Sequence, residues 1–427
     1  MKWLNGNCRV LLLAVLLQLP APLIAQDGGA ANIEMHGFLL GNFSGRTTGQ
    51  RPPGKEGEDF LLAEERLRLD IFGWAEAVEA SARVKGDVFH DAVADEFEAD
   101  LREAYLDYST AAFDFRLGRQ TVTWGVGDLL FINDVFPKDW VSFFSGRPLE
   151  YLKVGVDGCR SRYSAASINA EFLVLPFFEP DNLPTASRFF FFDPFAAVAF
   201  RPEDKPDTSF SNTELALRLY RRLGDFDVSA YAYKGFWRTP SLRPDNPVAP
   251  SRLTIFYPEL AVYGLSAQGS GFKGVLSFEA GYYHSRQDED GDDPVIPNSQ
   301  FKFLTGYQRQ IGEDFTVGLQ YLGEIIADHA ALRDALPAGF PAPRQYRDVL
   351  TLRLEQFFMH QSLNLGLFSF YSPADNDYLI QPKAAYKFSD KFSATLGANI
   401  FGGQESTTFL GQFDKNDNIY LSGRFDF

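Results

Sequence analysis

Short segments in which apolar and polar residues alternate recur along most of the chain. In the last of them, Ile419, Leu421 and Phe425 share one face, while Ser422 and Arg424 share the other. A repeat of two residues is the pattern of a β-strand with one apolar face and one polar face. The predicted strands span residues 33–43, 64–74, 76–88, 100–108, 113–120, 150–157, 163–175, 212–220, 226–237, 257–268, 273–285, 300–309, 315–326, 346–358, 362–370, 377–387, 391–401 and 417–427. The sequence therefore predicts an all-β protein.

The connections between these strands alternate in length. Counted from the first strand, they run long, short, long, short without an exception, and the long ones are residues 44–63, 89–99, 121–149, 176–211, 238–256, 286–299, 327–345, 371–376 and 402–416. Short turns at one end and long loops at the other are expected of a transmembrane antiparallel up-and-down β-barrel, whereas a soluble propeller or sandwich has no need of them. We therefore predict a barrel of about 18 strands, or about 16 if the weakly alternating segment 150–157 and one partner are not strands.

The N-terminal residues have the arrangement of a secretory signal peptide. Lys2 and Arg9 precede an apolar run over residues 10–19, which is followed by Pro20 and the small residue Ala25. We predict cleavage after Ala25, so that residues 1–25 are the signal peptide and residues 26–427 form the barrel. The apolar run is too short to cross a bilayer as a helix, which takes about 20 residues, and no later stretch is long enough.

Composition excludes several classes of protein. Loss of Lys2 and Arg9 leaves 38 basic residues against 56 acidic ones, a net charge near −18, so nucleic acid is not expected as a partner. Loss of Cys8 leaves Cys159 alone, which rules out an intramolecular disulfide and a cysteine-rich metal site. The chain has no CxxCH motif for covalent haem, and we expect no cofactor. The 42 Phe and 18 Tyr residues suit the aromatic girdles of a membrane barrel.

The final strand carries a further signal, because the chain ends on the aromatic residue Phe427. A closing strand with one apolar face and a terminal aromatic residue resembles the last strand of Gram-negative outer-membrane β-barrels. The resemblance implies a bacterial outer-membrane location, contact with membrane lipid and lipopolysaccharide, and recognition of Phe427 by the barrel-insertion machinery. It leaves open whether the chain forms a homo-oligomer.

The third long connection, residues 121–149, is too apolar for a solvated loop. It contains Leu129, Phe136, Trp140, Phe143 and Phe144 among other large apolar residues. A barrel of about 18 strands has room for an aqueous path, and such a loop is better explained if it folds inward against the wall. Its acidic residues would then project towards the pore, and they are Asp128, Asp134 and Asp139.

A motif overlaps the start of this loop. Its residues are Gly118, Arg119, Gln120, Trp124, Gly125, Asp134, Pro137 and Asp139. The motif resembles the GRQ…WG…NP.D signature of a poorly characterised group of outer-membrane porins related to alginate-export barrels, although Phe136 stands where that signature has Asn. The resemblance implies a passive or substrate-selective channel and does not identify the solute. Two roles stay open: Arg119 and Trp124 could act in selectivity, or Arg119 could pair with a loop carboxylate while Trp124 anchors the loop.

Basic residues on the polar faces of the early strands could face an acidic loop across the pore and create a transverse field. Acidic residues on the same faces nearly balance them, so the sequence assigns no preference for anions or cations. The candidate pore-lining and constriction residues are Arg66, Arg68, Arg83, Lys85, Arg116, Arg119, Trp124, Asp128, Asp134 and Asp139.

Sites for metal or catalysis have weaker support. Asp288, Asp290 and Asp292 could bind Ca²⁺, but the segment lacks the terminal glutamate of an EF-hand, and a solvated acidic loop is the favoured interpretation. The five His residues show no catalytic or metal-binding spacing, so we do not expect an enzyme. The leading hypothesis is a porin for small hydrophilic solutes, constricted by residues 121–149. The alternatives are a structural barrel that docks or sheathes a partner protein and, less favoured, an outer-membrane enzyme.

Overall fold

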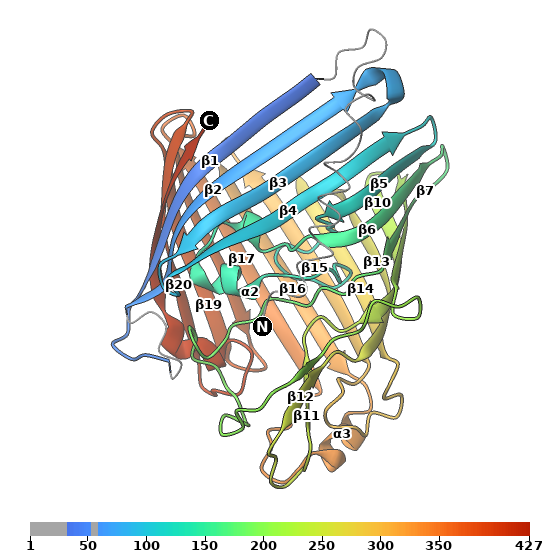
Figure 1. The fold of residues 1–427 in the computed structure, drawn as a ribbon, viewed down its shortest axis with the longest axis vertical. Helices are drawn as coiled ribbons and strands as arrows, with labels where there is room; N and C mark the ends of the chain where they lie inside the picture. The colour runs from blue at the N-terminus through green and yellow to red at the C-terminus, as the bar shows by residue number, and fades with distance from the viewer. Residues whose placement is uncertain (1–31, 53–58) are drawn as a thin grey trace.

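The computed structural model describes residues 32–52 and 59–427, so the predicted signal peptide lies outside the described residues. These residues form an antiparallel 18-stranded sheet that closes on itself, because the first strand pairs with both the second and the last (Figure 1). Every other strand of the barrel pairs with its neighbours in the chain. The prediction of an 18-stranded up-and-down barrel is confirmed.

The barrel strands are β1 (Asn32–Arg46), β2 (Phe60–Ala75), β3 (Ala80–Asp91), β4 (Glu96–Ser109), β5 (Phe113–Gln120), β6 (Val156–Ser164), β7 (Asn169–Leu175), β9 (Glu214–Leu223), β10 (Phe226–Phe236), β13 (Glu259–Gly271), β14 (Gly274–Ser285), β15 (Gln300–Ile311), β16 (Phe315–Ile326), β17 (Tyr346–Phe358), β18 (Leu363–Ser372), β19 (Asp377–Lys387), β20 (Phe392–Gly403) and β21 (Asn418–Asp426). A small sheet of β8 (Glu203–Asp204), β11 (Ser241–Pro244) and β12 (Leu253–Phe256) lies in the long loops. The short helices are η2 (Glu76–Val78), α2 (Trp140–Ser145), η3 (Leu149–Tyr151), α3 (His329–Ala335) and η4 (Gly411–Asn416).

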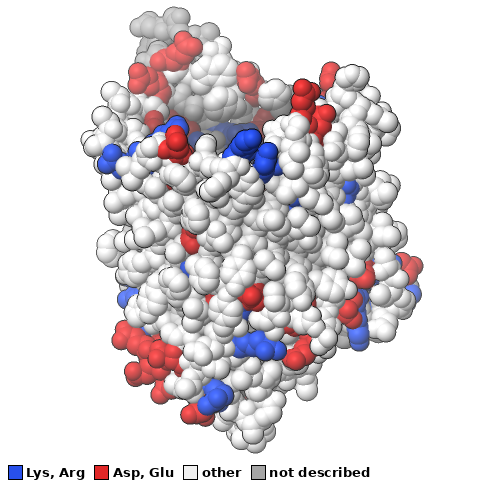
Figure 2. Space-filling view, turned by 180° about the vertical axis from the view of Figure 1, so that it is seen from behind, with Lys and Arg blue, Asp and Glu red and all other residues white. Residues whose placement is uncertain are grey.

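Alternation along each strand separates an apolar outer face from a polar inner face. On β2, Leu67 and Leu69 are 36% and 41% exposed on the outside, whereas Arg66 and Arg68 are each 4% exposed on the inside. On the face that Figure 2 shows, a broad middle band has few charged side chains, and most of them gather towards the two ends of the barrel. This is the surface expected of a barrel that contacts lipid. Among the described residues, no helix is long and apolar enough to cross a membrane.

Two neighbouring predicted strands are misplaced. The predicted strand over residues 163–175 contains the turn 165–168 between β6 and β7, and the predicted turn 158–162 lies within β6. Residues 150–157 were expected to be extended, but Glu150 and Tyr151 belong to η3, and β6 begins only at Val156. The side chain of Glu150 binds arginines of the barrel wall, and the Tyr151 ring lies among arginine side chains, so contacts inside the barrel hold these residues in a turn. The third long connection therefore extends to residue 155, and the strand count is unchanged because β6 still pairs with β5 and β7.

The two ends of the chain close the barrel. The amide of Phe427 donates to the carbonyl of Gly37 at 3.0 Å, and the amide of Gly37 donates to the carbonyl of Phe427 at 3.1 Å. The Phe427 ring lies over the backbone of Gly37, where an added Cβ atom would come within 2.6 Å of the ring and 2.5 Å of the Arg68 carbonyl oxygen. An aromatic ring that covers a strand glycine in this way helps to fix strand register.

Replacement of Gly37 should therefore impair barrel closure. We expect Gly37→Val to reduce the fraction of folded barrel, because the new side chain collides with backbone as well as with the terminal ring. Heat-dependent mobility on SDS gels measures this fraction. Gly45→Ala is the matched control on β1, since no atom lies within 4 Å of its added Cβ. Equal folding of the Gly37 variant and the control would contradict this account of closure.

Candidate functional site

The third long connection, residues 121–155, folds into the barrel and crosses its interior; we call it the lumen loop. Figure 1 shows its helix α2 enclosed by the strands. Ile132, Phe136 and Phe144 are at most 2% exposed, and they belong to one apolar cluster with side chains of the barrel wall. The prediction of an inward-folded third loop is confirmed, with its end shifted to residue 155.

A single carboxylate on β14 holds the first half of the lumen loop. Glu279 is 3% exposed and accepts hydrogen bonds from the backbone amides of Val126 at 2.8 Å, Gly127 at 3.1 Å and Asn133 at 2.7 Å. The Asn133 side-chain amide donates to the same carboxylate at 3.0 Å. Backbone groups removed from water need partners, and a carboxylate that accepts several N–H groups is a strong one. Glu279 therefore supplies the hydrogen-bond acceptor that water would provide to the backbone amides at residues 126–127 and at residue 133.

The tip of the lumen loop is fixed to β16 and β17. The Gln320 side-chain amide accepts from the Asp128 backbone amide at 2.7 Å and donates to the Asp128 carbonyl at 2.9 Å. The Asp128 carboxylate binds the Arg353 guanidinium through two contacts, one of them 2.8 Å long. The next residue, Leu129, has a φ of +58°, in the left-handed region that non-glycine residues rarely adopt. Contacts on both sides of Asp128 thus hold the backbone in a strained turn.

The motif residues Trp124 and Arg119 both make anchoring contacts. Trp124 donates through Nε1 to Glu171 on β7 at 2.6 Å, and its ring packs edge-on against Phe136 of the loop, with ring centroids 5.1 Å apart. Arg119 donates to Asp157 on β6 at 2.7 Å and to the Leu101 carbonyl at 2.6 Å. The contacts of Trp124 match the proposed loop anchor. Arg119 pairs with the strand carboxylate of Asp157 and, at 3.8 Å, with Glu179 of the next long loop, and with no carboxylate of residues 121–149.

The far end of the lumen loop is fixed to β20 and β21. Asp139 caps the N-terminus of helix α2, since its carboxylate accepts from the Ser142 amide at 2.7 Å, and Gly146 caps the C-terminus with a φ of +83°. The carbonyl of Phe144 accepts hydrogen bonds from the side chains of Asn399 at 3.1 Å and Asn418 at 3.2 Å. The loop is therefore attached to strands at several points around the barrel, from β7 and β14 to β17, β20 and β21.

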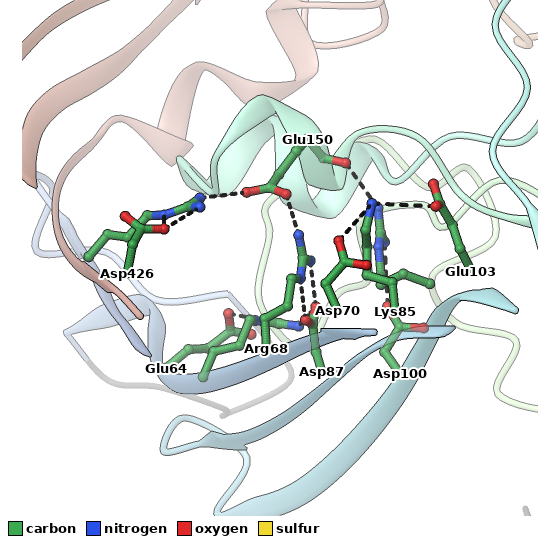
Figure 3. Close-up of polar contacts among 12 residues, drawn as sticks. Glu64, Arg68, Asp70, Lys85, Asp87, Asp100, Glu103, Glu150 and Asp426 are labelled. Carbon is green, nitrogen blue, oxygen red and sulfur yellow. Dashed lines mark hydrogen bonds and ion pairs between the residues drawn. The ribbon is translucent and has the colours of Figure 1, made fainter. Parts of the chain in front are cut away.

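The predicted basic residues of the early strands face the lumen, and the structure pairs each of them with acidic residues. The pairs are Arg66 with Asp87, Arg68 with Asp87 and Glu150, Arg83 with Asp70, Lys85 with Glu103 and Arg116 with Asp107. Figure 3 shows Glu150 of the lumen loop meeting Arg68 above Asp87. Charges removed from water are tolerated when they are paired and hydrogen-bonded. Much of the wall charge is therefore neutralised locally.

The three predicted loop acids have different surroundings. Asp128 reaches the wall at Arg353, and Asp139 caps α2. Asp134 is 4% exposed and binds Lys138 and Lys153 of the same loop.

A neighbouring long loop also contacts this region. Its residue Asp181 accepts from the Lys138 amide at 2.8 Å and from Trp140 Nε1 at 3.1 Å. Burial raises the pKa of Asp181, an effect that the nearby Lys138 cation opposes.

The lumen loop separates two cavities. The outer cavity, towards the long loops, has a volume of about 310 Å³ and lies between the lumen loop and the ends of β10, β14, β16 and β18. The inner cavity, towards the short turns, has a volume of about 280 Å³ and lies between the loop and β17 to β21. A third cavity of about 520 Å³, which we call the charged cavity, lies on the other side of the loop and is lined by arginine and acidic side chains from β2 to β5.

The weak calcium candidate has a structural explanation. The Asp288 carboxylate is buried and accepts from the backbone amides of Gly291 at 3.1 Å, Asp292 at 3.2 Å and Asp293 at 3.2 Å. It therefore stabilises its own turn. Over residues 32–52 and 59–427, no group of three or more His, Cys, Asp or Glu side chains is placed to hold a metal ion.

The sequence did not point to several residues that hold the loop, notably Gln320, Asn399 and Asn418. Alternation along their strands could have placed them on the inner face. The alternation does not show which inward polar side chain contacts a loop that is distant in the sequence.

Comparison with known proteins identifies the fold. No protein-family model matches the chain, and no curated protein matches it in sequence. Three similar solved structures are Pseudomonas aeruginosa OccD3 (TM-score 0.54, 11% identity, 95% of this chain and 96% of that one), Acinetobacter baumannii OccAB1 (0.53, 9%, 93% and 95%) and P. aeruginosa OccK11 (0.52, 10%, 92% and 95%). These likenesses show that the chain has the fold of outer-membrane porins. They do not confirm the GRQ…WG motif family.

Loss of the Glu279 carboxylate should free the lumen loop. Glu279→Ala leaves three backbone N–H groups without their acceptor, at about 1–3 kcal/mol for each one that stays buried. We expect added protease to cut residues 121–155 in the folded Glu279→Ala barrel and to spare the wild type. Glu279→Gln, which keeps one acceptor oxygen, should be cut at an intermediate rate.

Ser277→Ala is the control for this experiment. Ser277 lies on the same inner face of β14 and accepts from Gln268 at 3.0 Å. Its loss should leave the loop resistant. Equal resistance of Glu279→Ala and the control would show that Glu279 does not hold the loop.

Proposed function

We propose that the chain is a bacterial outer-membrane channel for passive or substrate-selective passage of small hydrophilic solutes, and that the lumen loop constricts it. The observation that carries the proposal is the attachment of this loop at several points around the barrel, at Glu171 on β7, at Glu279 on β14, at Arg353 on β17, and at Asn399 and Asn418 on β20 and β21. A loop held in this way leaves cavities of a few hundred Å³ beside it in place of an open lumen.

The surroundings of the barrel complete the proposal. The apolar outer band suits membrane lipid, and lipopolysaccharide would cover its outer leaflet. Residues 1–25 would direct export, and Phe427 would be read by the barrel-insertion machinery. A homo-oligomer is compatible with this arrangement.

The alternative functions have less support. A barrel that sheathes a partner protein needs an open lumen, and here the lumen loop occupies it. An enzyme needs a nucleophile beside a base. The buried carboxylates described above instead accept hydrogen bonds from loop amides, from the Trp124 indole or from arginine side chains. Solute passage therefore remains the function that the interior supports best.

Transport by the purified, refolded protein tests the proposal. We expect discrete openings in planar bilayers or entry of small solutes into liposomes, and the reversal potential in a salt gradient would report ion preference. If neither the wild type nor a variant without the constricting loop passes ions or solutes, the chain is not a channel.

Deletion of residues 127–144 should raise conductance, because it removes the loop tip and most of α2 from the lumen. Deletion of residues 329–342 is the matched control, since that segment contains α3 and lies in the long connection between β16 and β17. Single-channel recordings should show larger openings for the first deletion only. Unchanged conductance after the first deletion would refute the role of the lumen loop as the constriction.

A further inference from the structure

Four apolar side chains separate the outer cavity from the inner cavity. Leu129 and Phe143 of the lumen loop border both cavities. On β18, Phe370 borders the outer cavity and Phe368 borders the inner one. We call these four residues the septum. These four side chains therefore lie between the two cavities on this side of the loop.

The septum is closely packed. The rings of Phe143 and Phe370 meet edge to face with centroids 5.9 Å apart, and the centroids of Phe368 and Phe370 are 4.8 Å apart. All three rings are at most 8% exposed. Leu129 packs against the same apolar cluster. The contact between the loop and the wall is therefore apolar here.

Charges close to the septum are already engaged. Asp128 and Arg353 bind each other beside Leu129, and the Arg353 guanidinium lies over the Phe368 ring at 4.7 Å. In the outer cavity, Glu324 forms ion pairs with Lys302 at 2.9 Å and with Arg347 at 3.1 Å. Arg347 also binds Asp375 at 2.8 Å, so three acidic and three basic side chains balance here and leave no full charge to replace the water of an entering ion.

The outer cavity is also rich in aromatic side chains. Phe131, Trp140, Trp237, Tyr283 and Phe409 line it. Its volume of about 310 Å³ lies at the lower end of the range of small-molecule sites. Such walls favour solutes with an aromatic ring or another apolar face, because that face can pack against the rings of the wall as it leaves water.

From this arrangement we infer that the septum is an apolar constriction that restricts the passage of hydrated ions and selects small water-soluble molecules with an aromatic or apolar face. An ion would lose its hydration shell there without gaining polar ligands, and narrow apolar constrictions block conduction by expelling water. The inference rests on the proposed channel function, and it adds the chemical class of the solute and the residues that select it. The anchors at Glu279 and Gln320 hold the loop half of the septum in place.

A competing path lies on the other side of the loop. Tyr151 lines the charged cavity, and its ring centroid lies 4.6 Å from the Arg66 guanidinium carbon and 5.2 Å from that of Arg102. If ions cross there, polar substitution of Tyr151 should change conductance more than substitution in the septum.

Single-channel recordings distinguish the two paths. Phe143→Ser and Phe370→Ser should each raise conductance several-fold, because a hydroxyl group lets water enter the septum. Phe143→Leu, which stays apolar, and Tyr151→Ser should remain close to the wild type. Heat-dependent gel mobility confirms that each barrel is folded, and Phe370→Ser tests the wall side if the loop variant does not fold. A rise in conductance for Tyr151→Ser, with none for either Phe variant, would overturn the inference.

Uptake into liposomes tests the solute class. L-phenylalanine and L-glutamine carry the same backbone charges and differ in the side chain. We expect the wild type to admit phenylalanine several-fold faster than glutamine, and Phe143→Ser to remove this preference. Equal rates in the wild type would overturn the inference while leaving the channel intact. Exclusion of both solutes by every variant, including the deletion of residues 127–144, would instead contradict the channel function itself.

Discussion

Hydrogen bonding of the lumen loop by the barrel wall is the constraint on which the interior depends. A stretch of irregular chain inside a barrel exposes backbone amides and carbonyls that lack sheet partners, and burial without partners is costly. Glu279 accepts from three of these amides with one carboxylate. Gln320 pairs with both the amide and the carbonyl of Asp128, and two asparagines share the carbonyl of Phe144. Inward-facing polar side chains of the strands thus supply the hydrogen bonds that water supplies to a surface loop.

Electrostatics in the lumen follow the same logic. The basic side chains on β2 to β5 are inside, as their alternation predicts, but Asp70, Asp87, Glu103 and Asp107 lie beside them. Glu150 of the loop extends this network to Arg68. Paired charges fix the wall and the loop relative to each other. The apolar septum then offers an ion fewer polar ligands than the charged walls do.

The sequence predicts the barrel well because lipid imposes a simple rule on every strand. Outer positions such as Leu67 and Leu421 must be apolar, and the alternation reveals both strand number and facing. The rule fails at residues 150–157, where Glu150 and Tyr151 contact arginines of the wall and not lipid.

Prediction of the site was more limited for a related reason. Apolar composition showed that residues 121–149 fold inward, and Trp124 stood out by its motif. The wall residues that bind the loop could not be identified in this way, because Gln320 and Asn399 resemble any other inward polar residue of their strands. Only the three-dimensional register brings them to Asp128 and Phe144.

Amide hydrogen exchange in the folded barrel tests the central claim most directly, since it reports whether the wall holds the loop. If it does, the amides of Val126, Asp128 and Asn133 should exchange about as slowly as strand amides of β14. Exchange of these three amides as fast as those of the long connection 327–345 would show that the loop is not held, and would contradict both the constriction and the septum built on it.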